Sequence, residues 1–323
     1  MARIAVIGSG AVGLFYGAQF VLAGHDVRFL LRRDFARIAA DGIRIDTTAT
    51  TEIASARDGS SIVLPPTSFR ACRDVDACAL GGRPEWILLA VKTTAIAEVL
   101  PMVAALADAG TAVAVLCNGL GVEERVATRL PPESVFGALA QVCLRRREDG
   151  TVHHQAQGKL LLGHLRDDPD RLARLSQLVG GAGIASEACG CLLEARWRKL
   201  VWNFPFNGLS VALDADTATI LATPERCALV AELMAEIIAA ANADLAAAGK
   251  TSRIDAASWI LEMMRRTRAM GAYATSTLLD LRAGSALEVE ALFAEPVRRA
   301  LAAGIAAPRM TTLLEQVRER AGG

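Results

Sequence analysis

A lysine and two asparagines recur at intervals of four residues in the middle of the chain. Lys199, Asn203 and Asn207 lie in the stretch W-R-K-L-V-W-N-F-P-F-N-G-L of residues 197–209. In an α-helix this spacing places the three side chains on one face, and their apolar neighbours predict a buried setting. Burying an amine and two amides costs free energy unless each finds a hydrogen-bond partner. A small ligand with carboxylate, keto and hydroxyl groups would supply such partners; a water-satisfied helix core is the alternative.

A glycine-rich stretch near the start of the chain predicts a phosphate-binding loop. The residues G-S-G-A-V-G follow the apolar run 3–8 and begin a helical pattern over residues 11–23. In the G-x-G-x-x-G spacing, the first glycine permits a tight turn and the second lets the backbone approach a pyrophosphate. The third allows close packing of helix on strand, and the helix amides face the phosphate oxygens. We therefore predict dinucleotide binding through six residues, which are Gly8, Ser9, Gly10, Ala11, Val12 and Gly13.

The end of the second expected strand indicates which dinucleotide binds. NAD-binding folds usually carry an Asp or Glu there, which hydrogen-bonds the ribose hydroxyls. Here Arg32 and Arg33 occupy the position, and Asp34 comes only afterwards. A guanidinium can bind the 2′-phosphate of NADP through charge-assisted hydrogen bonds. We predict NADP(H) rather than NAD, with Arg32 as the first candidate ligand and Arg33 as the second, unless both are solvated strand-end residues.

Two polar residues follow later strands. Lys92 comes after the apolar run 87–91, and Asn118 comes after the run 113–117. Ligands of open α/β sheets bind beyond the carboxyl ends of the strands. Each residue is therefore either a ligand contact or an ordinary loop residue.

The elements that must position these residues change in kind along the chain. In the first half, helical patterns alternate with short apolar runs at 3–8, 26–31, 86–91, 112–117 and 135–143. This alternation predicts an α/β fold, with a Rossmann-type doubly wound sheet over residues 1–190 that antiparallel strands within 149–165 finish. Residues 191–323 predict an all-α C-terminal domain, with helices near 192–213, 224–248, 256–270 and 285–303 and a short one at the end.

Composition excludes several classes of partner. Lys plus Arg equals Asp plus Glu at 35 each, which gives no electrostatic reason to expect nucleic acid or a membrane surface. Seven scattered cysteines form no C-x-x-C pair, so no metal site is expected. The start has no signal-peptide layout, and acidic residues interrupt the alanine-rich stretch 229–248. We therefore expect a cytoplasmic protein without a membrane span.

Taken together, these motifs resemble the ketopantoate reductase family over nearly the whole chain. The resemblance begins with the G-S-G-A-V-G loop, Arg32, V-K at 91–92 and C-N-G-L-G at 117–121. It continues with the K-x-x-x-N-x-x-x-N stripe, S-x-L-x-D at 276–280, and Glu288 twelve residues after Ser276. The loop is generic, whereas the stripe with its downstream Ser and Glu is specific.

The resemblance implies NADPH-dependent reduction of 2-dehydropantoate to pantoate, or of a related small 2-keto acid to its 2-hydroxy acid. Lys199 would be the general acid that protonates the keto oxygen, and Glu288 would orient Lys199 or the substrate hydroxyl. A lysine near apolar walls can have its pKa lowered toward neutrality, which suits this role. The other implied contacts are Asn203, Asn207 and Ser276 to the substrate, and Lys92 and Asn118 where cofactor and substrate meet. A homodimer through the helical half is expected only by analogy.

One departure from the family pattern concerns the substrate. After Glu288 the family commonly shows an Asn-Gly, whereas this chain has L-F-A-E-P at 292–296. Phe293 would make that side of the pocket bulkier and less polar, which favours a branched or aryl 2-keto acid as the alternative. The stretch 47–83 is also longer and less regular than the resemblance leads us to expect.

Two further alternatives concern the chemistry. A non-catalytic NADP-binding regulator would require Lys199 and Glu288 to be incidental. An opine- or hydroxyacyl-type dehydrogenase would use a histidine, but all four precede the helical half, and we interpret them as surface or strand-end residues: His25, His153, His154 and His164. We interpret Arg145–Arg147 as a solvated charge run.

Overall fold

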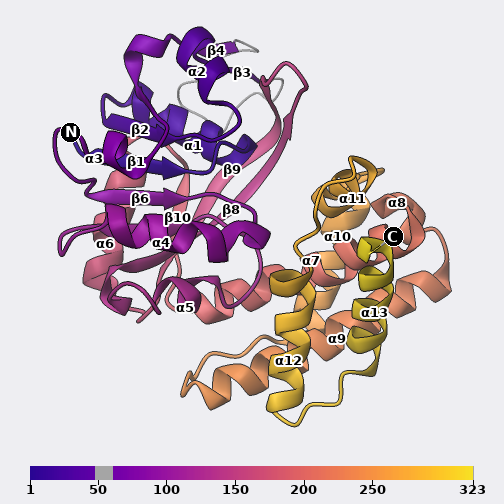
Figure 1. The fold of residues 1–323 in the computed structure, drawn as a ribbon. Helices are drawn as coiled ribbons and strands as arrows, with labels where there is room; N and C mark the ends of the chain where they lie inside the picture. The colour runs from indigo at the N-terminus through magenta and orange to yellow at the C-terminus, as the bar shows by residue number, and fades with distance from the viewer. Residues whose placement is uncertain (48–60, 323) are drawn as a thin grey trace. The chain divides into compact units, whose positions relative to one another are not determined.

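The chain folds into two compact units. The computed structural model describes residues 1–47 and 61–322 (Figure 1). One unit contains Met1–Cys117 and Val122–Leu192, and the other contains Asn118–Gly121 and Leu193–Gly323. The main division falls after Leu192, two residues beyond the boundary expected from the sequence. The four-residue segment Asn118–Gly121 belongs to the second unit although its neighbours in the chain belong to the first.

The first unit is built on a parallel sheet. Six strands run parallel in the order β8-β7-β6-β1-β2-β5. They are β1 (Arg3–Ile7), β2 (Asp26–Leu30), β5 (Arg70–Cys72), β6 (Trp86–Leu89), β7 (Ala112–Val115) and β8 (Val135–Arg146). Ile4 and Val6 of β1 join one apolar cluster, while Ala5 and Ile7 are equally buried on the opposite face. A sheet buried on both faces explains the continuous apolar runs and confirms the predicted α/β, Rossmann-type class.

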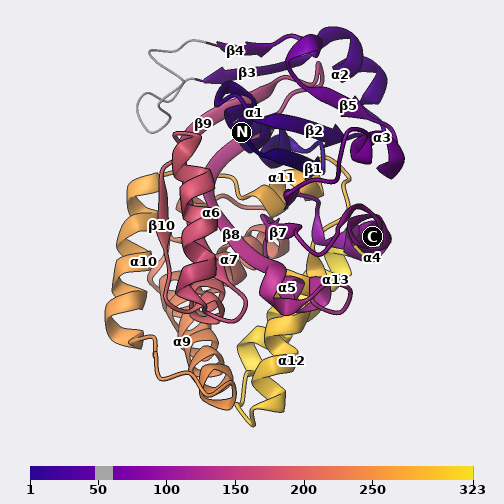
Figure 2. The same ribbon diagram turned by 90° about the vertical axis from the view of Figure 1, so that its left-hand side faces the viewer.

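Helices flank this sheet on both sides (Figures 1 and 2). The helices are α1 (Ala11–Leu22), α2 (Phe35–Asp41), α3 (Val75–Ala79), α4 (Ile96–Leu106), α5 (Val122–Val126) and α6 (Pro169–Gly181). Three 3₁₀ turns join them: η1 (Pro66–Ser68), η2 (Thr93–Ala95) and η3 (Pro132–Ser134). In α1 every residue from Gly13 to Val21 is buried, so this helix lies deep in the unit.

Four more strands extend the sheet beyond β8. β9 (Val152–His164) runs antiparallel to β8, and β10 (Ser186–Ala188) runs parallel to β9. β3 (Ile43–Thr47) pairs parallel with β9, and β4 (Ser61–Leu64) pairs antiparallel with β3. The prediction that the antiparallel strands finish the sheet is therefore wrong. The strands β3 and β4 lie beyond them. They are short and alternate buried with more exposed residues, which is a weaker sequence signal than a continuous buried run. Residues 48–60 of the irregular stretch lie outside the described residues.

In its described residues, the second unit contains helices joined by loops and no strand. Its elements are α7 (Leu192–Leu213), α8 (Thr217–Ile220), α9 (Pro224–Ala247), α10 (Ala256–Met270), α11 (Ser276–Arg282), the π-helical turn η4 (Glu290–Ala294), α12 (Glu295–Ala302) and α13 (Pro308–Gly322). Their core is a separate cluster that includes Trp197, Phe204, Ile237, Phe293 and Leu313. Two independent apolar cores are expected for a chain of this length.

The predicted helix over residues 285–303 begins in the wrong place. α11 ends before Gly284, which adopts a left-handed φ of +62°. Residues 285–288 have no regular secondary structure, and helical structure resumes as the π-helical turn η4 before α12. Apolar periodicity alone did not reveal that Pro296 lies in this region's first regular α-turn, where a proline is tolerated.

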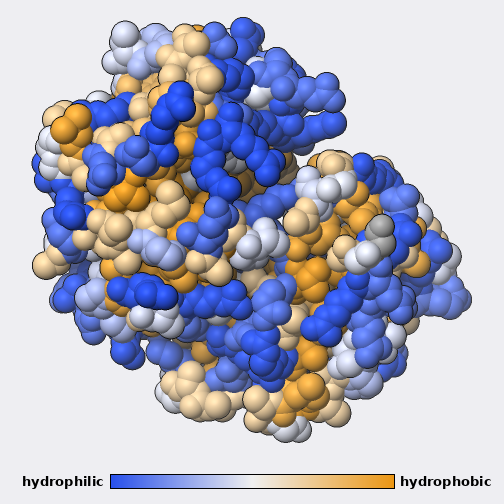
Figure 3. Space-filling model, viewed as in Figure 1, coloured by the Kyte–Doolittle hydropathy of each residue, from blue (hydrophilic) through white to orange (hydrophobic). Residues whose placement is uncertain are grey.

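The face shown in Figure 3 mixes hydrophilic and hydrophobic residues over both units. Within residues 1–47 and 61–322, no helix combines the length and the apolar character that crossing a membrane requires.

Candidate functional site

The glycine loop between β1 and α1 has the geometry that a phosphate loop requires. Gly8 has a φ of +116°, and a Cβ built on it would lie 2.5 Å from the carbonyl oxygen of Ala90. A Cβ on Gly13 would lie 2.0 Å from the carbonyl oxygen of Gly8. A Cβ on Gly10 would meet no described atom within 4 Å. The outer glycines therefore serve packing, and the middle glycine leaves its backbone open to an approaching group.

The N-terminus of α1 lies directly behind this opening. Gly10 is the N-cap residue, and no side chain of the described residues caps the helix. The first turn contains no acidic residue. Free amides and the positive end of the helix dipole favour an anion at this position. The residues present therefore fit the pyrophosphate of a dinucleotide.

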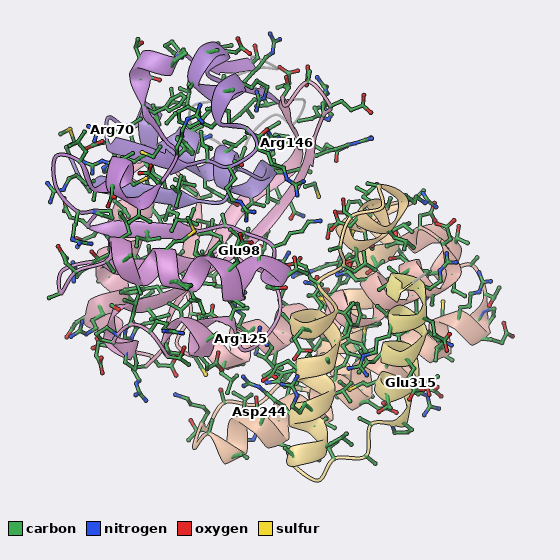
Figure 4. All side chains as sticks on the ribbon, in the orientation of Figure 1. Arg70, Glu98, Arg125, Arg146, Asp244 and Glu315 are labelled. Carbon is green, nitrogen blue, oxygen red and sulfur yellow. The ribbon has the colours of Figure 1, made fainter. Side chains whose placement is uncertain are left out.

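A cavity of about 380 Å³ lies beside the loop in the first unit. It is lined by Ser9, Arg32, Arg33, Asp34, Thr94, Ala95 and Glu98. Arg32 Nη1 lies 2.7 Å from Glu98 Oε1, and both side chains are 59% exposed. Figure 4 shows Glu98 on α4. The structure thus brings Arg32 and Ser9 together, and it adds an acidic partner for Arg32 that the sequence analysis missed.

Asp34 at the same cavity is neutralised by an arginine from a distant strand. Arg146, near the end of β8 (Figure 4), donates to Asp34 Oδ2 at 2.7 Å and to the Ser9 carbonyl at 2.9 Å. Hydrogen bonds and charge from Arg146 hold the pKa of Asp34 below its usual value. Arg147 pairs with Asp46 at 2.6 Å. Interpreting Arg145–Arg147 as a solvated charge run is therefore wrong for Arg146, which β8 holds against Asp34, whereas Arg145 and Arg147 are exposed.

Lys92 and Asn118 lie in different units. Lys92 is exposed at the N-terminus of η2, directly beyond the carboxyl end of β6. Asn118 belongs to the second unit, where its Oδ1 accepts a hydrogen bond from Lys199 Nζ at 2.9 Å. Lys92 thus lies beyond the carboxyl end of a parallel strand, where it was expected. Asn118 is instead held by its contact with Lys199 in the second unit.

Helix α7 carries the predicted polar stripe. Lys199, Asn203 and Asn207 lie on successive turns of one continuous helix that Pro205 does not interrupt. The side chains of Asn203 and Asn207 are buried, whereas Lys199 is half-buried. The three side chains thus lie on one helix face as predicted, and the Asn118 amide accepts a hydrogen bond from Lys199, the first of them.

The surroundings of Lys199 lower its pKa to about 7. Burial of the amine is the largest cause, and repulsion from Arg196 acts in the same direction. The carboxylate of Glu288 opposes both by favouring the charged form. Arg196 is itself buried and precedes Lys199 by three residues, a helical spacing that could have been recognised in the sequence. An amine with this pKa can both hold and release a proton near neutral pH.

Asn207 presents a buried acceptor without a donor. Its side chain is only 3% exposed, and none of the described residues donates a hydrogen bond to its Oδ1. Leaving a buried polar atom unsatisfied costs about 1–3 kcal/mol. A ligand with a hydroxyl donor would satisfy it.

Hydrogen bonds of the Ser210 hydroxyl connect α7, next to Asn207, with the start of α11. Ser210 Oγ donates to the Asn207 carbonyl at 2.9 Å and lies 2.6 Å from Thr275 Oγ1. Thr275 caps α11, whose first residue is the exposed Ser276. Neither Ser210 nor Thr275 was predicted from the sequence, although Ser210 continues the polar stripe one turn beyond Asn207.

Two sequence interpretations need correction. Phe293 is fully buried and packs against Phe204 with ring centroids 5.2 Å apart, so it belongs to the core of the second unit. It therefore gives no reason for a bulkier substrate. His154 and His164 are 1% exposed, so neither is a surface residue, although His164 does lie at a strand end as the last residue of β9. Both hydrogen-bond to backbone carbonyls within the first unit.

Comparison with known proteins supports one family across both units. The model for ketopantoate reductase PanE/ApbA matches residues 4–167, and the model for its C-terminal part matches residues 192–321. A 2-dehydropantoate 2-reductase of Nostoc sp. is 31% identical over 322 residues, which cover 98% of this chain and 94% of that protein.

Solved structures agree with this match. The crystal structure of 2-dehydropantoate 2-reductase from Geobacter metallireducens GS-15 has a TM-score of 0.89 at 34% identity and covers 98% of this chain and 99% of its own. A ternary structure of D-mandelate dehydrogenase with NADH and anilino(oxo)acetate shares the fold, with a TM-score of 0.84 at 19% identity over 99% and 98% of the two chains. The chain belongs to the ketopantoate reductase family.

Proposed function

We propose that the protein reduces 2-dehydropantoate to pantoate with NADPH as the reductant. The observation that carries the proposal is the Lys199 amine, whose pKa lies near 7 and whose side chain lies on one helix face with two buried asparagines. The names of the relatives supply the substrate class, since the proteins that match over nearly the whole chain are called 2-dehydropantoate 2-reductases. A small 2-keto acid has the acceptors and donors that this helix face needs.

Lys199 is the proton donor in this proposal. Its ammonium donates a proton to the keto oxygen, where negative charge develops during reduction. Asn118 Oδ1, 2.9 Å from Lys199 Nζ, fixes the direction of the amine, and the Glu288 carboxylate favours its protonated form. When bound, NADPH supplies the hydride that the keto carbon accepts.

Substrate binding falls to the remaining polar groups of the second unit. Asn207 Oδ1 accepts a hydrogen bond from a substrate hydroxyl, which gives this buried atom its missing partner. Asn203, one turn away, and the exposed Ser276 contribute amide and hydroxyl donors to the substrate carboxylate.

Cofactor binding falls to the glycine loop, with Gly10 leaving its backbone open. Arg32 binds the 2′-phosphate, and Lys92 contacts the cofactor from the end of β6. Asn118 remains a proposed cofactor contact in addition to its bond with Lys199.

Arg32→Ala is expected to weaken NADPH binding about 10- to 100-fold and NADH binding only a few-fold. The guanidinium makes charge-assisted hydrogen bonds to a phosphate that NADH lacks, each worth about 1.5–3 kcal/mol. Fluorescence titration with both nucleotides measures the two dissociation constants. Arg33→Ala, at the second candidate ligand, should weaken NADPH binding less than Arg32→Ala does. Glu98→Gln should strengthen NADPH binding because it releases Arg32 from its ion pair. An equal loss of both nucleotides in Arg32→Ala would reject the 2′-phosphate role.

Asn207→Leu is expected to raise the KM for the keto acid about 3- to 10-fold without lowering the unfolding midpoint. The substitution removes a buried acceptor that has no donor in the free protein, so folding loses no hydrogen bond there. Asn242 is the matched control because its amide is satisfied, with Nδ2 donating to Ile254 O at 3.0 Å and Oδ1 accepting from Ile254 N at 2.8 Å. Asn242→Leu should lower stability and leave the KM unchanged. Identical behaviour of the two variants would contradict a substrate role for Asn207.

The proposal is tested by following NADPH oxidation with a panel of 2-keto acids that includes 2-dehydropantoate. Saturable oxidation, highest with 2-dehydropantoate, supports it. Nucleotide binding without oxidation by any keto acid would favour a regulatory NADP-binding protein instead.

A further inference from the structure

The segment Asn118–Gly121 is attached to the π-helical turn η4. Leu120 N–H donates to the carbonyl oxygen of Ala291 at 2.9 Å. Both partners belong to the second unit. This bond attaches the segment that carries Asn118, the hydrogen-bond partner of Lys199, to the turn that follows Glu288.

The sequence around η4 explains why the Ala291 carbonyl is available. In an α-helix it would accept from the amide of Glu295, but that amide donates to Glu290 O, five residues back. The next amide along the chain would belong to Pro296, which has no N–H. A proline also clashes with the carbonyl four residues before it, and widening the helix to a π turn relieves that clash. Pro296 and the π turn thus leave one backbone acceptor for Leu120.

Gly119 permits the close approach. Its φ is +90°, and a Cβ built on it would lie 2.6 Å from both the Cβ and the carbonyl oxygen of Ala291. Because backbone atoms cannot move aside as a side chain can, no other residue fits here without displacing the segment. Gly121 has a similar φ of +81°, but a Cβ there would meet only the Glu295 side chain, at 3.3–3.4 Å. An alanine would therefore carry similar backbone strain at both positions, but only at position 119 would its Cβ clash with the backbone of Ala291.

We propose that Gly119 and the Ala291 carbonyl of η4 position Asn118 so that it receives the Lys199 amine. This inference rests on the proposed role of Lys199 as proton donor. Glu288 lies two residues before η4, and Leu292 N donates to its carbonyl at 3.2 Å. Backbone bonds of η4 thus hold both the segment of Asn118 and the residue Glu288, whose carboxylate acts on Lys199, while Arg196 is the other charged group that acts on its amine. Gly119 and Pro296 are positioning residues and touch no reacting atom.

The test compares Gly119→Ala with Gly121→Ala. Gly119→Ala should lower kcat about tenfold or more, because a displacement of about 1 Å is enough for such losses. Gly121→Ala should stay within about threefold of the wild type. Equal kcat values for the two variants would overturn the proposal.

A second readout follows the Lys199 side chain itself by NMR titration. The chain has four lysines, so its resonance can be assigned by substitution. Asn118 stabilises the protonated amine by accepting from it, so losing this contact should lower the pKa of Lys199 and move the alkaline limb of kcat to lower pH. Asn118→Ala and Gly119→Ala should cause the same shift, and the double variant should add nothing. Independent, additive shifts would overturn the proposal.

If Gly119→Ala does not fold, Pro296→Ala provides the same test. Alanine restores the missing N–H and removes the proline ring, so the segment can adopt an α-helical register in which the Ala291 carbonyl no longer accepts from Leu120. We therefore expect a lower pKa of Lys199 and a lower kcat, with an unchanged unfolding midpoint. A wild-type titration curve would contradict the positioning role. The two proposals can fail separately. If the wild-type protein reduces no keto acid but its Lys199 pKa shifts in the variants as predicted, the proposed function is rejected and the positioning inference stands.

Discussion

Lys199→Met is expected to lower kcat for 2-keto acid reduction about 10²- to 10⁴-fold, the usual contribution of a positioned general acid. Methionine retains the length of the side chain but cannot donate a proton. The dinucleotide contacts proposed for the first unit are unaffected, so NADPH affinity should not change. Because burial already disfavours the ammonium, removing it should not lower the unfolding midpoint at neutral pH.

The pH dependence of the wild type follows from the same amine. A general acid must be protonated to act, so kcat should fall as pH rises through about 7, the lowered pKa of Lys199. An unshifted lysine would keep its proton to much higher pH and place the limb near its ordinary value of 10.5. Steady-state kinetics over pH measures the limb, which should be absent from the residual activity of Lys199→Met.

Lys159→Met is the matched control for Lys199→Met. Lys159 lies on β9, its side chain is 41% exposed, and its Nζ pairs with Glu187 Oε2 at 2.6 Å. This variant should retain wild-type kcat and pH dependence. If Lys199→Met kept turnover within a few-fold of the wild type, a proton-donor role for Lys199 would be excluded.

Gly10→Val is expected to weaken NADPH binding at least 100-fold while leaving the unfolding midpoint unchanged. The backbone at Gly10 is extended, with φ −69° and ψ 177°, which valine adopts without strain. A Cβ there meets no described atom within 4 Å, so the added side chain occupies only the space that a pyrophosphate would approach. Calorimetric titration with NADPH and thermal unfolding together measure both effects.

Gly190→Val is the matched control for Gly10→Val. A Cβ on Gly190 also meets no described atom within 4 Å, and this residue lies in the same unit but far along the chain from the loop. It should bind NADPH as the wild type does. Undiminished binding by Gly10→Val would show that the loop does not hold the pyrophosphate.

Much of the fold could be predicted because its signals are local. Apart from β5, the parallel strands follow the predicted apolar runs, and the predicted helices match α7, α9 and α10 to within a residue of their observed ends. The strands β3, β4, β5 and β10 were missed because each is short and at least partly exposed. The late start of the helix after residue 285 depends on Gly284 and Pro296, whose effects are matters of backbone geometry rather than of periodicity.

The candidate site divides in the same way. Spacing alone was enough to place Lys199, Asn203 and Asn207 on one face, because helix geometry relates residues four apart. Contacts between distant segments could not be predicted. Arg146 reaches Asp34 across 112 residues and Asn118 reaches Lys199 across 81 residues. The core position of Phe293 likewise depends on its packing against Phe204, which no local pattern encodes.

The most direct test of the account measures NADPH oxidation by the purified wild-type protein and by Lys199→Met at saturating 2-dehydropantoate. We predict rapid oxidation by the wild type, stoichiometric formation of pantoate, and a loss of about 10²-fold or more in the variant, with NADPH binding intact in both. NADPH binding without any pantoate formed, or equal rates in the two proteins, would contradict it.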